Sequence, residues 1–233
     1  MSRYLIPGDP PVEITLRRSA RARRFSLRVS RLDGRVTLSM PARAREAEAL
    51  DFARDKAGWL RSVLCEGGGR WALTHGAELS VEGRALTLTA APVRAARIEG
   101  AQLLVPADPA RLRPALTAFL RLLARQRLQA ASDRHAAALG RSFTRLTLRD
   151  TRSRWGSCTA DGGLMYSWRL ILAPAEVLDY VAAHEVAHLA EMNHSPAFWA
   201  TVARLMPGYA PHRAWLKRHG ADLHRYDFGS AGD

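Results

Sequence analysis

Two histidines four residues apart, with a glutamate directly after the first, constrain the fold of this chain more than any other feature. They are His184 and His188, and the glutamate is Glu185. Four residues turn an α-helix by about 400°, which places both imidazoles on one face, roughly 6 Å apart along the axis. Pro174, followed closely by an acidic residue, favours a helix start. The spacing therefore predicts a helix over residues 174–190.

Two imidazoles placed in this way can bind a single metal ion. Zinc accepts histidine nitrogens at about 2.0–2.1 Å, and the next side chain, Glu185, then projects beside the metal. From there its carboxylate can take a proton from a water molecule and return it to a leaving group. The alternative is a helix whose histidines are exposed or buried in the core.

A third candidate ligand, His194, lies six residues after His188. Six helical residues rotate a side chain by about 600°, to the far side of the helix, so the helix must end between the two. Asn193 tolerates a left-handed backbone, and Ser195 followed by Pro196 is typical of the start of a new helix. Three histidines leave the fourth tetrahedral position open to water, as in catalytic zinc sites. We therefore expect one Zn²⁺ per chain.

Alternation of hydrophobic and polar residues predicts strands along much of the chain. The expected strands lie within residues 25–40, 78–105 and 143–170. Hairpin turns are favoured at Asp33-Gly34, Glu82-Gly83 and Asp161-Gly162-Gly163. Two further amphipathic helices are expected over residues 44–64 and 114–139. The first carries Trp59 in its buried stripe, and Gly140 stops the second.

Together these patterns predict an α+β fold with two regions. A β-rich N-terminal region with one helix occupies residues 1–106, where Pro106 and Pro109 close the second β segment. Residues 107–233 hold the long helix and the histidine helix. The candidate site therefore lies in the second region.

The formal net charge of +13, from 35 Lys and Arg against 22 Asp and Glu, favours binding to polyanions. Arginines cluster near the N-terminus, at Arg17, Arg18, Arg21, Arg23 and Arg24. One hypothesis makes this cluster a nucleic-acid-binding surface. The other makes it the polar outer face of a pair of strands.

The N-terminal sequence has no apolar leader, and no stretch approaches the ~20 apolar residues of a membrane span. The two cysteines, Cys65 and Cys158, form no CxxC pair, which indicates a reducing compartment rather than a disulfide framework. We therefore expect a cytoplasmic protein without membrane contact. Cys158 is expected to be a small buried residue rather than a nucleophile, because no spare base accompanies it.

Residues 154–158 fit an edge strand against which an extended peptide can pair. In that position Arg154 and Ser157 are candidates for contacting a substrate or stabilising its transition state. A structural salt bridge is the alternative role for Arg154.

The spacing of His184, His188 and His194 equals that of the metzincins, HExxHxxGxxH, except that Glu191 stands where they have glycine. Glu191 follows His188 too soon to match the glutamate ligand of gluzincins, so its side chain is expected in solvent or beside the ligands. Tyr209, which follows a Met-Pro-Gly sequence, resembles the methionine turn and tyrosine of metzincins. It is therefore a further candidate for substrate binding.

Several motifs together resemble a known family, the YgjP-like metal-dependent hydrolases, which are related to the SprT and WLM zincins. They are RWGSC at residues 154–158, HEVAHLAEMNHSPAFW at 184–199, MPGY at 206–209 and HRAWLKRHG at 212–220. The resemblance implies a zincin-like catalytic core with Zn²⁺ on His184, His188 and His194 and with Glu185 catalytic. It does not name a substrate.

The leading hypothesis is a zinc-dependent hydrolase, and more specifically a metallopeptidase that acts on a protein or peptide. One alternative places the zinc site in a nucleic-acid-associated module that acts on bound protein. Another directs the site to a non-peptide amide or ester. A metal-stabilised binding protein without activity is disfavoured by Glu185 and by the open fourth ligand position.

Overall fold

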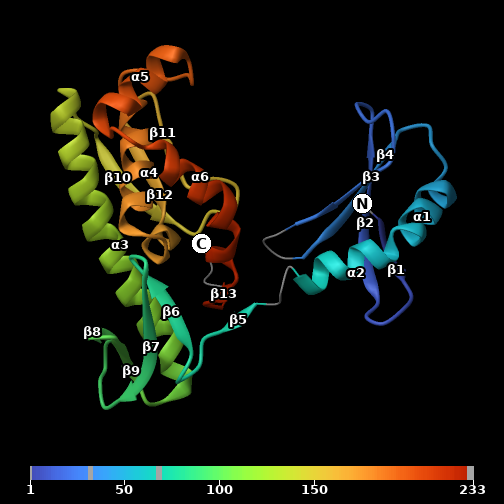
Figure 1. Cartoon of the computed structure of the whole chain (residues 1–233), viewed down its shortest axis with the longest axis horizontal. Coiled ribbons are helices and arrows are strands. Elements are labelled where there is room, and N and C mark those ends of the chain that lie inside the picture. The colour runs from blue at the N-terminus through green and yellow to red at the C-terminus, as the bar shows by residue number, and fades with distance from the viewer. Residues whose placement is uncertain (1, 31–33, 67–69, 230–233) are drawn as a thin grey trace. The chain divides into compact units, whose positions relative to one another are not determined.

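The computed structural model describes residues 2–30, 34–66 and 70–229. The chain divides into two compact units, Met1–Trp71 and Ala72–Asp233 (Figure 1). This division differs from the expected boundary at residue 106, which lies inside the second unit. The reason is that the sheet before residue 106 packs against the long helix that follows it.

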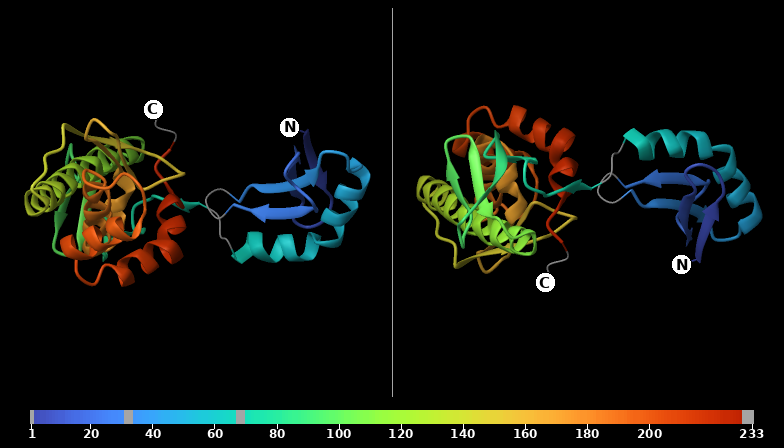
Figure 2. Two further views of the ribbon diagram at one scale, coloured as in Figure 1. Left: turned by 90° about the horizontal axis from the view of Figure 1, so that it is seen from above. Right: turned by 90° about the horizontal axis from the view of Figure 1, so that it is seen from below.

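The N-terminal unit is a four-stranded sheet covered on one face by two helices. Its strands, in spatial order, are β1 (Ser2–Ile6), β2 (Val12–Ser19), β4 (Val36–Pro41) and β3 (Ser26–Val29). The pairs β1–β2 and β3–β4 are antiparallel, whereas β2 and β4 are parallel. Helices α1 (Glu46–Asp55) and α2 (Ala57–Glu66) lie along the sheet (Figure 2). Ile14, Leu38, Met40 and Leu60 form the centre of this unit's core.

Two expectations for this unit need correction. The single helix expected over residues 44–64 is broken at Lys56 into α1 and α2. Trp59, expected in the buried stripe, has 47% of its surface exposed, while Ala53 and Leu60 are fully buried. The hairpin of β3 and β4 is confirmed. Its expected turn includes Asp33, which lies outside the described residues.

The C-terminal unit repeats the same strand order in its first sheet. This sheet consists of β6 (Glu78–Val81), β7 (Arg84–Ala91), β9 (Gln102–Pro106) and β8 (Arg97–Glu99), with β7 and β9 parallel. The predicted hairpin at Glu82-Gly83 is confirmed, and both residues have positive φ. Helix α3 (Pro109–Leu139) follows directly and runs past both sheets of the unit (Figure 1). It begins five residues earlier than expected, where Asp108 caps it, and it ends at Gly140 as predicted.

A second sheet and a helical layer complete this unit. The sheet has the order β10 (Arg145–Arg149), β12 (Gly163–Ser167) and β11 (Gly156–Cys158), and β11 lies at its edge. β12 ends at Ser167 rather than Leu170, because residues Trp168–Leu172 form a buried 3₁₀ turn. The remaining helices are α4 (Ala175–Ala187), α5 (Pro196–Leu205) and α6 (Ala210–His219), followed by a 3₁₀ turn at Gly220–His224. A short pair, β5 (Trp71–Ala72) and β13 (Tyr226–Asp227), forms a separate two-stranded sheet.

The α+β architecture expected from the sequence is confirmed. Trp168, Tyr166 and Phe198 are the largest fully buried side chains of the C-terminal unit. None of the described helices is both long enough and apolar enough to cross a membrane.

Candidate metal centre

Helix α4 places the first two histidines in the C-terminal unit. It is buried along most of its length and packs against α3, which fixes its rotation about its own axis. His184 lies in its last turn, and His188 is the residue that caps its end. The helix ends at Ala187, three residues before the expected end at residue 190. This early end allows the chain to turn back toward the helix.

The segment after α4 returns the third histidine to the first two. The Asn193 side chain accepts a hydrogen bond from the Ser195 backbone N–H at 3.1 Å, which closes a tight turn. The Ser195 hydroxyl then accepts from the Phe198 N–H at 3.3 Å and caps α5, with Pro196 at its first position. The capped second helix predicted from the sequence is confirmed. His194 lies between these two features and faces His184.

The three imidazoles converge as the spacing predicts. One nitrogen from each of His184, His188 and His194 lies within 4.8 Å of the other two. The Nε2 atoms of His184 and His194 are 3.1 Å apart. In a tetrahedral zinc site with bonds of 2.0–2.1 Å, two ligand nitrogens lie roughly 3.3 Å apart. The three nitrogen donors and the His184–His194 spacing therefore fit a divalent metal ion.

Hydrogen bonding and burial prepare two of these rings for metal binding. The Nδ1 atom of His188 lies 2.9 Å from the Glu191 carbonyl oxygen, and an N–H donated there leaves Nε2 free as a ligand. Glu191 thus contributes its backbone rather than its carboxylate. Burial, followed by the neighbouring His188 and His194, lowers the pKa of His184 to about 3. Burial also lowers the pKa of His188. Both rings are therefore neutral near pH 7, as metal binding requires.

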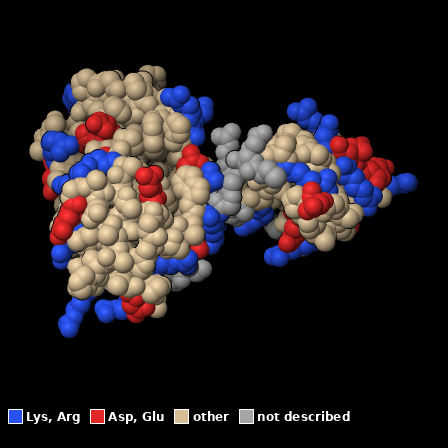
Figure 3. Space-filling view, turned by 60° about the horizontal axis from the view of Figure 1, so that its bottom comes forward, with Lys and Arg blue, Asp and Glu red and all other residues tan. Residues whose placement is uncertain are grey.

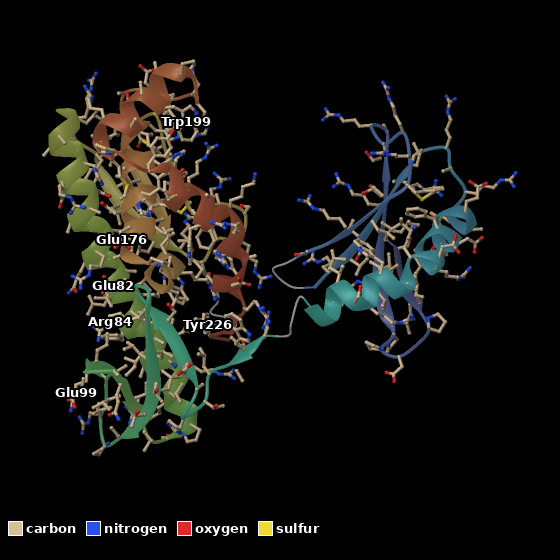
Figure 4. All side chains as sticks on the ribbon, viewed as in Figure 1. Glu82, Arg84, Glu99, Glu176, Trp199 and Tyr226 are labelled. Atoms are coloured by element: carbon tan, nitrogen blue, oxygen red, sulfur yellow. The ribbon has the colours of Figure 1, made fainter. Side chains whose placement is uncertain are left out.

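Phe198 forms the floor beneath the three histidines. It is fully buried, and its ring centroid lies 4.9, 4.4 and 4.7 Å from those of His184, His188 and His194. Trp199, the residue after Phe198 on α5 (labelled in Figure 4), stacks on His194. The spacing of the motifs alone indicates no role for Phe198 at the site. Its position three residues after the Ser195 cap was the available signal, because the first turn of α5 had to face His194.

Glu185 lies beside the cluster, against the edge strand β11. It is 6% exposed, and burial raises its pKa to about 8, while the charge of Arg154 acts to lower it. The backbone of Gly156 approaches it so closely that a Cβ at Gly156 would lie 2.6 Å from Glu185 Cγ and Oε1. The glycine of the RWGSC motif thus makes room for the glutamate of the HExxH motif.

Glu185 and the histidines open into a cleft of about 460 Å³, here called the metal cleft. Its wall opposite α4 includes Arg154, Ser157 and Cys158 from β11 and the residues before it. Arg154 is exposed and forms no salt bridge with any described residue. Burial, and then the Glu185 charge, raises the pKa of Cys158 to about 11. Its thiol is therefore protonated near neutral pH, and its side chain is half-buried on the cleft wall rather than buried as expected.

Other candidate residues lie outside the metal cleft. Tyr209 stacks between Tyr180 and Trp199, at centroid distances of 6.0 and 5.6 Å, and lines a neighbouring cleft. Of the tryptophans in the C-terminal unit, Trp168 is buried, whereas Trp155 and Trp199 are only half-buried.

The arginine cluster belongs to the N-terminal unit, whereas the histidines belong to the C-terminal unit. Within the cluster, Arg18 hydrogen-bonds the carbonyls of Ala42 and Ala44 and pairs with Glu46 at 3.2 Å. The other members, Arg17, Arg21, Arg23 and Arg24, are exposed. Arg18 is thus engaged in holding β2 to the start of α1.

A helix with two histidines and a glutamate, a third histidine from the following turn and an edge strand across the cleft define a metal-dependent hydrolase. Residues 23–219 match the YgjP-like metallopeptidase domain, so the chain belongs to the YgjP-like family. A crystal structure of the metallopeptidase zymogen abylysin of Pyrococcus abyssi is similar at 20% identity, with a TM-score of 0.37. The similarity covers 42% of this chain and 97% of that one. A comparison with curated proteins finds no match.

Proposed function

We propose that the chain is a zinc-dependent metallopeptidase, with His184, His188 and His194 as ligands and Glu185 as general base. The observation that carries this proposal is the convergence of three imidazoles within 4.8 Å beside a buried glutamate that faces an open cleft. Three imidazole donors favour zinc over calcium or magnesium, which prefer oxygen ligands.

A zinc ion held there would polarise a substrate carbonyl and make a water molecule more acidic. The Glu185 carboxylate accepts the proton of the attacking water and returns it to the leaving amine. Its raised pKa suits both steps, because the group takes up and releases a proton near neutral pH. Arg154, on the opposite wall of the metal cleft, is placed to stabilise the developing oxyanion or to hold a substrate carboxylate.

The shape around the site favours a polypeptide substrate. β11 pairs with β12 on one side only, so its other edge can pair with an extended peptide. Three clefts lie in series along this strand and its flanks. Trp155 lines one of about 560 Å³, Gly156, Ser157 and Cys158 line the metal cleft, and residues 159–162 line one of about 740 Å³. Such a row accommodates several consecutive residues, with Ser157 among those that contact the substrate.

The decisive experiment incubates an extract of intact proteins with zinc-loaded wild type or zinc-loaded Glu185→Gln. The new peptide ends that each protein produces are counted by mass spectrometry. Loss of the general base should lower cleavage by about 10²- to 10⁴-fold with zinc content unchanged. Glu176→Gln is a matched control, because Glu176 is exposed in the first turn of the same helix (labelled in Figure 4). Equal cleavage by wild type and Glu185→Gln would reject the proposed mechanism. A parallel screen with simple esters and amides tests the non-peptide alternative.

A nucleic-acid-associated role is a second candidate, and the N-terminal unit favours it. Residues 1–71 hold 15 Lys and Arg against 8 Asp and Glu, a formal net charge of +7. The helices pack on one face of its sheet, and the register places Arg17 and Arg28 among serines and threonines on the other. Figure 3 shows Lys and Arg side chains at the surface of both units. We propose that this unit binds nucleic acid through its phosphates.

A further inference from the structure

A second cleft, here called the aromatic cleft, lies next to the metal centre in the C-terminal unit. Its volume is about 560 Å³, which is within the range of ligand-binding sites. Its lining combines aromatic and aliphatic surface with two cations: Trp155, Tyr180, Tyr209, Leu216, Arg213 and Lys217. Among the residues that the structure describes, no acidic side chain lines it. Nothing in the proposed proton transfer uses these side chains.

The aromatic cleft shares a wall with the metal centre. Tyr180 precedes His184 by one helical turn of α4, and their ring centroids are 6.0 Å apart. Tyr209 stacks on Tyr180 at 11° between planes, and Trp199 stacks on Tyr209 at 16°. Trp199 in turn lies 5.7 Å from His184. This stack forms a continuous aromatic wall that contacts the His184 ring.

The two cations of the aromatic cleft are not neutralised by the protein. Arg213 lies over the Trp199 ring at 4.2 Å, and Lys217 follows one turn later on α6. Both are exposed, and neither pairs with a carboxylate among the described residues. An anionic group bound at this rim would therefore meet two uncompensated charges beside apolar surface.

The edge strand connects the two clefts. Trp155, in the aromatic cleft, directly precedes Gly156 in the metal cleft. Antiparallel strand pairs outnumber parallel ones about two- to three-fold, and a peptide antiparallel to β11 runs from Cys158 toward Trp155. Its residues after the scissile bond then enter the aromatic cleft.

We infer that the aromatic cleft is the specificity site for the residues that follow the scissile bond, and that it selects a large apolar or aromatic side chain next to a carboxylate. This inference rests on the proposed peptidase function. The side chain lies against Trp155, Tyr180 and Tyr209, and the carboxylate pairs with Arg213 and Lys217. That carboxylate comes either from an acidic side chain or from the C-terminus of the substrate.

A binding assay tests the site separately from turnover. Fluorescein-labelled peptides that carry Phe-Glu, Phe-Lys or Ala-Glu are titrated with zinc-loaded Glu185→Gln and followed by anisotropy. Phe-Glu peptides should bind at least about tenfold more tightly than either of the others, because they use both the apolar wall and the cations. Amidated peptides with an internal glutamate, and free-acid peptides without one, distinguish the two sources of the carboxylate.

Reversing the charges of the aromatic cleft is a second test of the specificity site. Lys217→Glu, and Arg213→Glu together with Lys217→Glu, should shift the ratio of Kd values for Phe-Glu and Phe-Lys peptides by about tenfold or more toward Phe-Lys. Lys217→Glu alone leaves the Arg213–Trp199 contact intact, so its effect cannot come from a displaced wall. Arg218→Glu is the matched control, since Arg218 is on α6 but outside the cleft.

The two proposals fail in different ways. Equal binding of all three peptides, or an unchanged ratio in the charge-reversal variants, would overturn the specificity site even if wild type cleaves protein. Selective binding without any cleavage by zinc-loaded wild type would support the site and reject the peptidase function.

Discussion

Gly156 and Glu185 pack so closely that a side chain on the glycine would clash: a Cβ there would lie 2.6 Å from Oε1 and 2.8 Å from Cδ of the glutamate. Gly156 does not have a positive φ, so its backbone conformation alone does not require glycine. The close approach of the Glu185 side chain is therefore the reason that no larger residue fits. This contact couples the edge strand to the histidine helix.

Gly156→Ala should accordingly displace the Glu185 carboxylate while leaving the three histidines in place. A shift of about 1 Å in a catalytic group can lower the rate by about 10²-fold, and the overpacking should cost about 1–3 kcal/mol of stability. Zinc content should stay near that of wild type. Cleavage rate, metal analysis and thermal unfolding measure these three effects. Gly58→Ala is the control, because a Cβ there meets nothing within 4 Å.

Zinc content should be about one equivalent per chain after expression in zinc-replete medium, because three imidazole ligands and an open position suit this ion. His184→Ala combined with His188→Ala should abolish binding, and His194→Ala should weaken it before it affects folding. Elemental analysis and chelator competition measure both. Full zinc retention in the double variant would place the metal elsewhere.

His224 should make the stability of the fold depend on pH. Burial, then the charge of Arg169, lowers the pKa of this residue to about 4, whereas the charge of Asp150 acts to raise it. Its ring also lies 5.0 Å from that of Trp155. The folded state thus prefers the neutral ring, so the stability due to this group is complete above about pH 6.5 and is lost as pH falls toward 4. As pH falls from 8 to 4, the Tm should fall less steeply for His224→Gln than for wild type. Parallel curves of Tm against pH for the two proteins would contradict this assignment.

Binding of nucleic acid by the N-terminal unit should be sensitive to salt and nearly independent of sequence. The slope of log K against log salt is about −0.9 per phosphate contacted on duplex DNA. Replacing the exposed Arg21, Arg23 and Arg24 with Ser should weaken binding and flatten this slope without changing zinc content. If neither DNA nor RNA shifts in a gel at ~10 μM protein and low salt, the charge has another origin and this role is rejected.

The chemistry of the site could be predicted from the sequence because the signals are local. Four-residue spacing on a helix, followed by a capped restart at Ser195, determines how His184, His188 and His194 come together. Phe198 and Gly156 could not be assigned in this way. Their roles depend on contacts between elements that the spacing along the chain does not specify.

The boundary between the units shows the same limit of local patterns. Pro106 and Pro109 are typical of a break, yet β9 leads directly into α3, and the two pack together. Alternation predicted the hairpins, but it carried no signal for the parallel pairs β2–β4 and β7–β9, which join strands that are not consecutive. Trp59 fits the helical stripe but is exposed, because the break at Lys56 separates its helix from the preceding one.

The origin of the three ligands also determines how quickly a bound metal ion would exchange. His184 and His188 are fixed by a helix packed in the interior, whereas the exposed His194 is carried by the short connection before α5. Opening of that connection alone would release one ligand and admit solvent, without unfolding α4. Metal exchange would then follow the kinetics of a local fluctuation, and the lifetime of the bound ion would be much shorter than that of the fold.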